Sequence, residues 1–241
     1  MTGPMILRQR PSPNFGPRPP GMPVDTLVLH YTGMTSAQAA LDRLCDPAAQ
    51  VSAHYLVEED GAVWALVDEA MRAQHAGKSF WRGHAGLNDR SVGIEVVNPG
   101  HAHGYPDFPA LQMATVCELC LEVLGRHSIP ARNVVAHSDV APDRKEDPGE
   151  KFDWFGLARN GVGLWPLATP DAGVAAIDDI DEMRAGLHWL GYDVEATGEA
   201  DAALASVLRA FQRHWRPEAV TGQADRGTLD RLAAVLRLCE T

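Results

Sequence analysis

The sequence has no run of 18 apolar residues, and its first 21 residues contain no apolar stretch long enough for the core of a secretory signal peptide. The first absence predicts that the chain has no transmembrane helix. The second favours a cytoplasmic location, with the periplasm or cell envelope as the alternative.

Basic residues are also few. The chain has 21 Lys and Arg against 32 Asp and Glu, which gives a net charge of −11. Because nucleic acids and anionic membranes attract clusters of Lys and Arg, this balance argues against either as a partner.

Cysteine is scarce, with four residues that do not form a pair of Cys-x-x-Cys knuckles. A structural zinc site of four thiolates is therefore not expected. Nor is a disulfide framework, since the chain is long and its cysteines are so few. Cys117 and Cys120 lie three apart in a predicted helix, and we expect both to face the core.

What the chain does contain is an alternation of strand-like and helix-like segments behind a proline-rich start. Residues 1–23 include seven prolines and are interpreted as an extended arm. Short apolar runs predict strands, and apolar residues at three- and four-residue steps predict helices. The predicted strands are 24–30, 53–57, 62–67, 91–97 and 134–137. The predicted helices are 36–45, 108–127 and a short helix that starts at 152.

The same spacing predicts which side chains are buried. The strand 91–97 alternates, so that Val92, Ile94 and Val96 share one face while Glu95 lies on the other, beside Gly93. The helix 108–127 has a predicted core face made by Leu111, Ala114, Cys117, Leu121 and Leu124. Residues 75–91 are rich in glycine, histidine and polar groups, which is typical of a surface loop.

These elements predict an α/β domain over residues 24–165, with a central mixed β-sheet flanked by helices. Residues 166–175 are interpreted as a linker. Residues 176–241 are predicted to form a small three-helix domain, because apolar residues recur at helical spacing in three segments. They are Met183, Leu187 and Leu190, then Leu204, Leu208 and Phe211, then Leu229, Leu232 and Leu236.

Two of the ten histidines stand at the ends of predicted strands. His30 ends the first strand, His137 ends the last, and Asp147 follows ten residues later in a polar loop. Strand ends at one edge of a sheet are where sites gather in α/β folds. Two imidazoles and one carboxylate are a typical ligand set for a catalytic zinc ion. Spacing alone leaves the alternative of structural histidines and an aspartate that forms a turn before Pro148.

Four separated segments carry a resemblance to a known family. They are Val-Leu-His-Tyr-Thr at 28–32, Ser-Ala-His-Tyr at 52–55, Val-Gly-Ile-Glu at 92–95, and the stretch from Ala136 to Gly149. In this order, from about residue 14 to about 165, the chain resembles the N-acetylmuramoyl-L-alanine amidases of the amidase-2 type. This group includes AmpD and AmiD and is related to phage amidases and peptidoglycan recognition proteins.

The resemblance implies zinc-dependent hydrolysis of the amide between the lactyl group of N-acetylmuramic acid, or its anhydro form, and L-alanine. It implies that His30, His137 and Asp147 bind Zn²⁺. It also implies that Glu95 is the general base and that Lys145 stabilises the oxyanion. Glu95 as an exposed strand residue and Lys145 as a solvated loop charge are the alternatives. The implied partner is peptidoglycan or an anhydro-muropeptide.

Other polar residues are assigned by their surroundings. His75, Trp81 and Asn88 belong to the predicted loop 75–91, where they can contact sugar or peptide or simply face solvent. His54 is interpreted as a structural residue that packs near the site, and it is left out of the ligand set.

The C-terminal region carries a second resemblance. The segments 187–192, 208–214 and 221–229 are similar to the peptidoglycan-binding domain found beside many cell-wall hydrolases. A helical bundle with a packing role only is the alternative. For the whole chain, the rival functions are a recognition protein that binds muropeptides without cutting them and a zinc peptidase that acts on the peptide stem.

Overall fold

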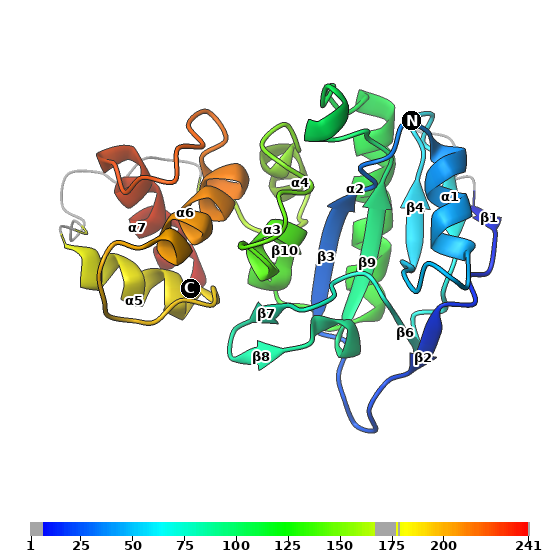
Figure 1. The fold of residues 1–241 in the computed structure, drawn as a ribbon, viewed down its shortest axis with the longest axis horizontal. Coiled ribbons are helices and arrows are strands. Elements are labelled where there is room, and N and C mark those ends of the chain that lie inside the picture. The colour runs from blue at the N-terminus through cyan, green and yellow to red at the C-terminus, as the bar shows by residue number, and fades with distance from the viewer. Residues whose placement is uncertain (1–6, 167–176, 178, 241) are drawn as a thin grey trace.

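A computed structural model describes residues 7–166, 177 and 179–240, and its centre is a six-stranded mixed sheet (Figure 1). The strand order is β1-β5-β4-β9-β3-β10. Strands β4, β9, β3 and β10 run parallel, while β5 is antiparallel to β4. The bounds are β1 Leu7–Gln9, β3 Thr26–Tyr31, β4 Tyr55–Val57, β5 Val63–Ala65, β9 Ser91–Val96 and β10 Val134–Ala136. The predicted central mixed sheet is confirmed.

Strand β3 lies between β9 and β10 and fixes the register of the site. Leu29 pairs with Ile94 on one side and with Ala136 on the other, so that His30 stands level with Glu95. The alternation predicted for 91–97 is confirmed, because Val92, Ile94 and Val96 are all buried in one hydrophobic cluster. Side chains at odd and even positions of each strand therefore serve two different layers.

Helix α2 (Ala110–Arg126) covers the first face of the sheet, together with α4 (Trp154–Arg159). The helix was predicted, but its buried face was not. Its buried side chains are Gln112, Thr115, Val116, Leu119, Cys120 and Val123, whereas Leu111 is 56% and Leu121 43% exposed. Gln112 lies on the buried face because its side-chain amide donates to the carbonyls of Val57 and Val97 at strand ends, at 3.2 and 2.9 Å. Of the two cysteines expected in the core, Cys120 is buried and Cys117 only half-buried.

The second face of the sheet is covered in two parts. Helix α1 (Ala37–Cys45) packs over β4, and the Ser36 hydroxyl caps its start by accepting from the Ala39 amide at 3.2 Å. The C-terminal helices pack beside β10 on the same face, where Val28 and Val135 join their core. Between α1 and the C-terminal helices, the middle of this face is not covered by a helix and contributes to a pocket.

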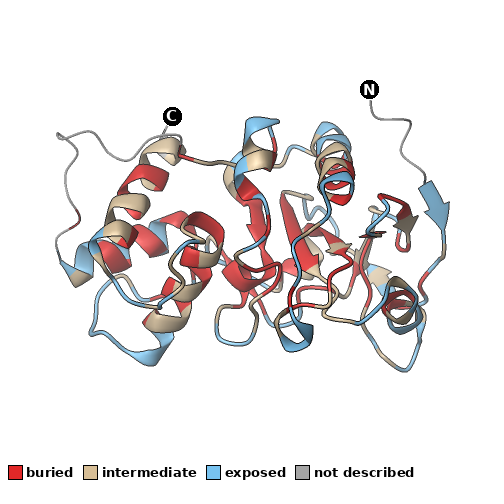
Figure 2. Ribbon diagram, turned by 90° about the horizontal axis from the view of Figure 1, so that it is seen from above, coloured by how far each residue is buried: buried red, intermediate tan, exposed pale blue. Residues whose placement is uncertain are grey.

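The C-terminal helices are α5 (Ile180–Leu190), α6 (Ala202–Trp215) and α7 (Arg226–Glu240), as predicted. Their buried side chains form one cluster with residues of the N-terminal part, including Trp81 and Val140. Figure 2 shows buried segments running from the helices into the sheet. The predicted linker 166–175 lies outside the described residues apart from residue 166.

The proline-rich arm and the loop 75–91 are more ordered than the sequence suggested. The arm contributes β1 to the sheet and pairs β2 (Phe15–Pro17) with β6 (Met71–Ala73). The predicted surface loop instead folds back as β7 (Phe80–Trp81), β8 (His84–Ala85) and the 3₁₀ turn η1 (Leu87–Asp89), with His75, Trp81 and Leu87 buried. Shorter elements are η2 (His101–His103), η3 (Ala131–Asn133) and α3 (His137–Val140).

Among the described helices, none is both long and apolar enough to cross a membrane.

The Glu69 carboxylate links the C-terminal end of α2 to strand β4. Glu69 accepts hydrogen bonds from Tyr55 at 2.7 Å and from Arg126 at 2.8 and 3.1 Å, and it contacts His127 at 2.6 Å. Burial alone would raise the pKa of Glu69, but the hydrogen bonds from Arg126, Tyr55 and His127 outweigh it and lower the pKa to about 2. The ionised carboxylate is therefore stabilised by folding.

We predict that Glu69→Gln lowers stability at neutral pH and flattens its acid dependence. A depressed folded-state pKa gives stability that is present above the unfolded pKa near 4.5 and is lost as pH falls toward 2. The shift corresponds to no more than about 3 kcal/mol. Urea unfolding at pH 7 and pH 3 measures the change in the free energy of unfolding. Glu122→Gln is the control, because the exposed Glu122–Arg126 pair contributes under about 1 kcal/mol; equal losses in both variants would contradict the assignment.

Candidate functional site

The site lies where β10, β3 and β9 end, on the face of the sheet between α1 and the C-terminal helices. His30 is the fifth of the six residues of β3, and Glu95 is its partner on β9. Since Ala136 pairs with Leu29, the next residue, His137, emerges beside His30. His137 is not part of the strand as predicted; it is the first residue of α3. The parallel register thus places three functional side chains in a row.

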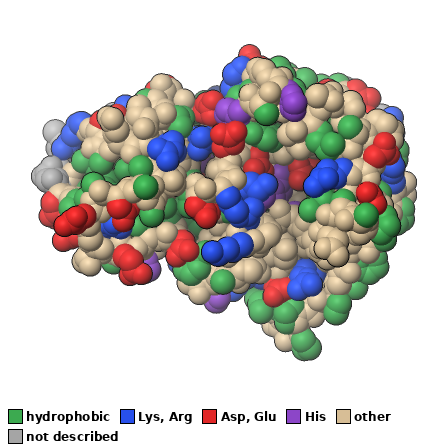
Figure 3. Space-filling model, in the orientation of Figure 1, with side chains coloured by type: hydrophobic (Ala, Val, Ile, Leu, Met, Phe, Trp, Pro, Cys, Tyr) green, Lys and Arg blue, Asp and Glu red, His purple; other side chains and the backbone are tan. Residues whose placement is uncertain are grey.

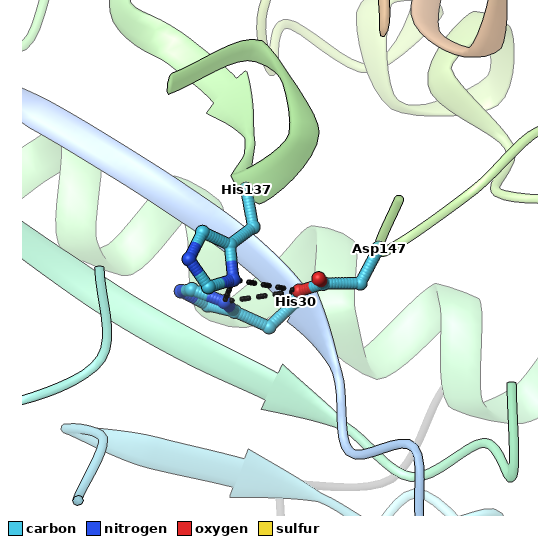
Figure 4. A group of neighbouring side chains, drawn as sticks. All are labelled: His30, His137 and Asp147. Atoms are coloured by element: carbon cyan, nitrogen blue, oxygen red, sulfur yellow. Dashed lines mark hydrogen bonds and ion pairs between the residues drawn. The ribbon is translucent and has the colours of Figure 1, made fainter. Parts of the chain in front are cut away.

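His30, His137 and Asp147 converge on one point, with the aspartate supplied by the loop after α3 (Figure 4). The two Nδ1 atoms are 2.9 Å apart, and Asp147 Oδ2 lies 3.2 Å from His30 Nδ1 and 3.0 Å from His137 Nδ1. All three side chains are buried. The three residues that the sequence singled out as a group are therefore brought together by the fold, from positions up to 117 apart.

A chain of hydrogen bonds sets the tautomer of His30. The Ser91 hydroxyl donates to the Leu87 carbonyl at 2.6 Å, so it can only accept from His75 Nε2 at 3.0 Å. Burial lowers the pKa of His75 well below its usual value, with the neighbouring His30 adding to the effect, so the ring is neutral. Its Nδ1 therefore accepts from His30 Nε2 at 3.0 Å. The proton of His30 is on Nε2, and Nδ1 presents a lone pair to the site.

A backbone carbonyl sets the tautomer of His137. Its Nε2 lies 3.3 Å from the Ala76 carbonyl, which can only accept, so the tautomer with hydrogen on Nε2 is the one that fits. The same carbonyl accepts from Arg144. Ligand histidines in metal sites are oriented by partners of this kind on the far ring nitrogen.

Three acceptor atoms thus face one another with no donor between them. Two imidazole lone pairs and a carboxylate at 2.9 to 3.2 Å repel each other unless a cation lies among them. Burial, together with the nearby His137, lowers the pKa of His30 to about 4, which disfavours a proton as that cation. Ligands about 2.0–2.1 Å from a tetrahedral zinc ion lie roughly 3.3 Å apart. The residues therefore fit a zinc ion with small adjustments.

Asp147 is also anchored through its backbone. Its backbone carbonyl accepts from the Ser138 amide at 3.0 Å, which fastens the loop to the segment carrying His137.

Glu95 and Lys145 line one pocket together with His137 and Asp147. The pocket has a volume of about 380 Å³, and residues of α1 form its opposite wall. Oε2 of Glu95 is buried and has no hydrogen-bond partner in the described parts of the chain. Burial raises the pKa of Glu95 well above its usual value, Asp147 raises it further, and Lys145 partly opposes the rise. A carboxyl group with a raised pKa can both take up and release a proton near neutral pH.

The pocket opens on the face of the molecule seen in Figure 3, where histidine and acidic side chains lie in a hollow with Lys and Arg beside it. Arg43 of α1, Arg144 and Lys145 are the basic residues that line it. These cations stand beside Glu95, Glu146 and Asp147, which line the same pocket.

The fold separates the three residues suggested for substrate contact. His75 lines the pocket but lies beneath His30, over Gly93, where an added Cβ would come within 2.4 Å of the His75 ring. Trp81 is buried against Tyr192 of the C-terminal part, with ring centroids 5.1 Å apart. The Asn88 side chain accepts from the amides of His75 and Ala76 at 3.1 and 2.8 Å. Trp81 and Asn88 are not among the residues that line the pocket.

Other residues support the site, and of these only His54 was interpreted in advance. His54 is buried, and its Nδ1 accepts from the Gly93 amide at 2.9 Å, in keeping with a structural residue. Ser91 and Arg144 orient the ligand histidines, and Tyr31 lines the pocket beside His30. The glycine in Val-Gly-Ile-Glu was the available signal for His75, because a glycine inside a strand often marks a close approach.

Comparisons with known proteins agree with this geometry. Residues 20–150 match the family described as N-acetylmuramoyl-L-alanine amidase, and residues 177–232 match a putative peptidoglycan binding domain. The N-acetylmuramoyl-L-alanine amidase AmiD of Escherichia coli K12 is 37% identical over 223 residues, covering 85% of this chain and 79% of AmiD. The 1,6-anhydro-N-acetylmuramyl-L-alanine amidase AmpD of the same strain is 33% identical over 164 residues, covering 61% of this chain and 87% of AmpD.

Solved structures give the same result. AmiD of E. coli, in complex with the substrate anhydro-N-acetylmuramic acid-L-Ala-D-γ-Glu-L-Lys, superposes with a TM-score of 0.78 at 36% identity and covers 91% of each chain. AmpDh3 of Pseudomonas aeruginosa, in complex with anhydromuramic pentapeptide, gives 0.79 at 33% identity and covers 93% of this chain and 94% of its own. Both similarities extend over the sheet and the C-terminal helices together.

We predict that Ser91→Ala weakens zinc binding by roughly tenfold or more, since partners of ligand histidines commonly contribute that much. Without the hydroxyl, His75 Nε2 has no acceptor and the tautomer of His30 is no longer fixed. Competition with a chromogenic chelator measures the affinity, and ¹⁵N shifts of the imidazoles report the tautomer.

Ser138→Ala is the matched control. Ser138 is equally buried and adjoins His137, yet its hydroxyl has no hydrogen-bond partner among the residues described. Its loss should leave zinc affinity unchanged. An equal effect of the two substitutions would mean that the hydrogen bonds from His30 through His75 to Ser91 do not orient His30.

Proposed function

The chain belongs to the N-acetylmuramoyl-L-alanine amidase family, and from this membership we propose that it is a zinc-dependent amidase. Its reaction is hydrolysis of the amide between the lactyl group of N-acetylmuramic acid, in its anhydro or ordinary form, and L-alanine. The observation that carries the zinc dependence is the convergence of His30 Nδ1, His137 Nδ1 and Asp147 Oδ2 as three acceptors.

His30, His137 and Asp147 would hold the zinc ion. When bound, zinc supplies Lewis-acid chemistry, which polarises a carbonyl and lowers the pKa of water to about 7. The chain's own residues do the rest of the work: they hold the ligands in place, position the scissile amide and move protons.

Glu95 is the proton carrier. Its position beside His30 on the neighbouring strand puts the unpartnered Oε2 at the floor of the pocket. It takes a proton from the attacking water and returns it to the nitrogen of L-alanine as the amide bond breaks. General acid–base catalysis of this kind contributes roughly 100- to 10,000-fold.

Lys145 stabilises the negative charge that develops on the carbonyl oxygen. It lines the pocket next to Asp147, and its charge lowers the pKa of Glu95, which supports a role close to the reacting amide. A preorganised cation there stabilises the tetrahedral intermediate more than the planar amide.

The substrate class rests on the relatives. The AmiD and AmpDh3 structures hold an anhydromuramyl tripeptide and an anhydromuramic pentapeptide, and both superpose over nearly the whole chain. The γ-linked glutamate of the AmiD ligand keeps a free α-carboxylate, which suits the basic side chains of Arg43 and Arg144 at the pocket rim. The C-terminal region would bind wall material and raise its concentration at the site.

Product analysis tests the function. We predict that the protein releases free stem peptide from soluble anhydro-muropeptide and from intact sacculi, as detected by mass spectrometry. A chelator should abolish release, and added zinc should restore it. Intact muropeptide that is retained but never cleaved would instead indicate a recognition protein, and cleavage within the stem would indicate a peptidase.

We predict that Glu95→Gln keeps zinc bound but lowers turnover at least 100-fold, because the amide cannot accept the proton. Steady-state kinetics and metal analysis measure the two properties separately. Glu122→Gln, an exposed substitution on α2, should behave as wild type. Turnover near the wild-type rate in Glu95→Gln would remove Glu95 from the mechanism.

A further inference from the structure

The C-terminal helices contact the two segments that carry metal ligands. Helix α6 packs against α3, the short helix that begins at His137, and Arg213 of α6 reaches the loop that ends at Asp147. A domain that only tethers the protein to the cell wall has no need of contacts at this place.

A buried carboxylate lies at the centre of the contact. Asp139 in α3 is 1% exposed. Its Oδ1 accepts from the Tyr192 hydroxyl at 2.6 Å, and its Oδ2 lies 2.6 Å from His214 Nδ1. Both partners belong to the C-terminal part and are themselves buried. Burial and the adjacent carboxylate raise the pKa of Tyr192 well above its usual value, so the phenol keeps the proton that it donates.

The same carboxylate fixes the backbone at a ligand. Asp139 Oδ2 also accepts from the Ala136 amide at 2.8 Å, the residue directly before His137. The side chain thereby closes the first turn of α3 and sets the direction in which His137 leaves the strand. A buried carboxylate that loses a donor is left with an unmet hydrogen bond, so the three bonds depend on one another.

Two further contacts act on the same segments. The His214 ring stacks on Trp154 of α4, with centroids 3.8 Å apart. Arg213 pairs with Glu146 at 3.4 Å, one residue before Asp147. The C-terminal part therefore touches the neighbourhood of two of the three ligands, which the Ser138–Asp147 backbone bond links to each other.

We propose that the C-terminal helical domain is a structural component of the metal site, in which Tyr192 and His214 position His137 through Asp139. This role is additional to any binding of wall material, and it rests on the proposed function insofar as the site binds zinc. Tyr192 and His214 are positioning residues, because they act on His137 and not on the substrate.

The test uses the full chain and four variants. Tyr192→Phe and His214→Leu each remove one donor to Asp139, and each should weaken zinc affinity by about tenfold or more. His214→Asn keeps an N–H donor near the position of Nδ1 and should recover most of the affinity. Gln212→Leu is the control, because Gln212 is fully buried in the same helix but bonds only within the C-terminal part, to Thr221, Gly222, Gln223 and Thr228.

Zinc affinity is measured by chelator competition, and amide hydrogen exchange is measured over residues 136–149. Faster exchange there in Tyr192→Phe and His214→Leu, but not in Gln212→Leu, supports the proposal and needs no metal. Wild-type affinity and exchange in both donor-removal variants would overturn it, as would equal losses in Gln212→Leu. A wild-type chain that binds no zinc would refute the proposed function, while the exchange comparison would still decide the positioning role.

Discussion

The mutual repulsion of three acceptor atoms is the constraint on which this site depends. Two imidazole nitrogens and a carboxylate oxygen are held about 3 Å apart in a buried part of the fold. Each would move away if it were free to do so. The surrounding structure prevents this: parallel strand register places His30, the Ala76 carbonyl orients His137, and the Ser138 amide holds the Asp147 loop. Folding therefore prepares a site whose repulsion only a cation relieves.

Several features of the fold follow from that arrangement. Gly93 lacks a side chain because the His75 ring occupies its place, and His75 in turn supports His30 from below. The segment around His75 is buried because it supplies both the relay to Ser91 and the carbonyl that orients His137. Sequence elements that look like ordinary loop and strand thus form the underside of the site.

Much of this could be predicted from the sequence. The mixed sheet, α1 and the three C-terminal helices follow from apolar spacing, which is a local property. Strand-end positions and a carboxylate ten residues further on pointed to His30, His137 and Asp147, while Glu95 and Lys145 depended mainly on the resemblance to amidases. Glu95 and Lys145 were correctly expected near the ligands, although their roles stay predictions.

What could not be predicted depends on partners that are distant in sequence. The buried face of α2 was misjudged because Gln112 is drawn inward by two strand-end carbonyls that spacing cannot reveal. The loop 75–91 was taken for a surface segment, since its polar residues find their partners inside the protein. Nothing in the spacing of Tyr192 or His214 indicated that both would meet Asp139.

The Asp139 contact bears on how freely such a protein can be recombined. Fusing its catalytic part to an unrelated wall-binding module would leave a buried anion with one of its three donors, the Ala136 amide. A functional chimera would have to carry Tyr192 and His214 across the junction, or replace the aspartate with a residue that needs no outside donor. The boundary between the two parts in the sequence is thus not a place where the molecule can simply be cut and rejoined.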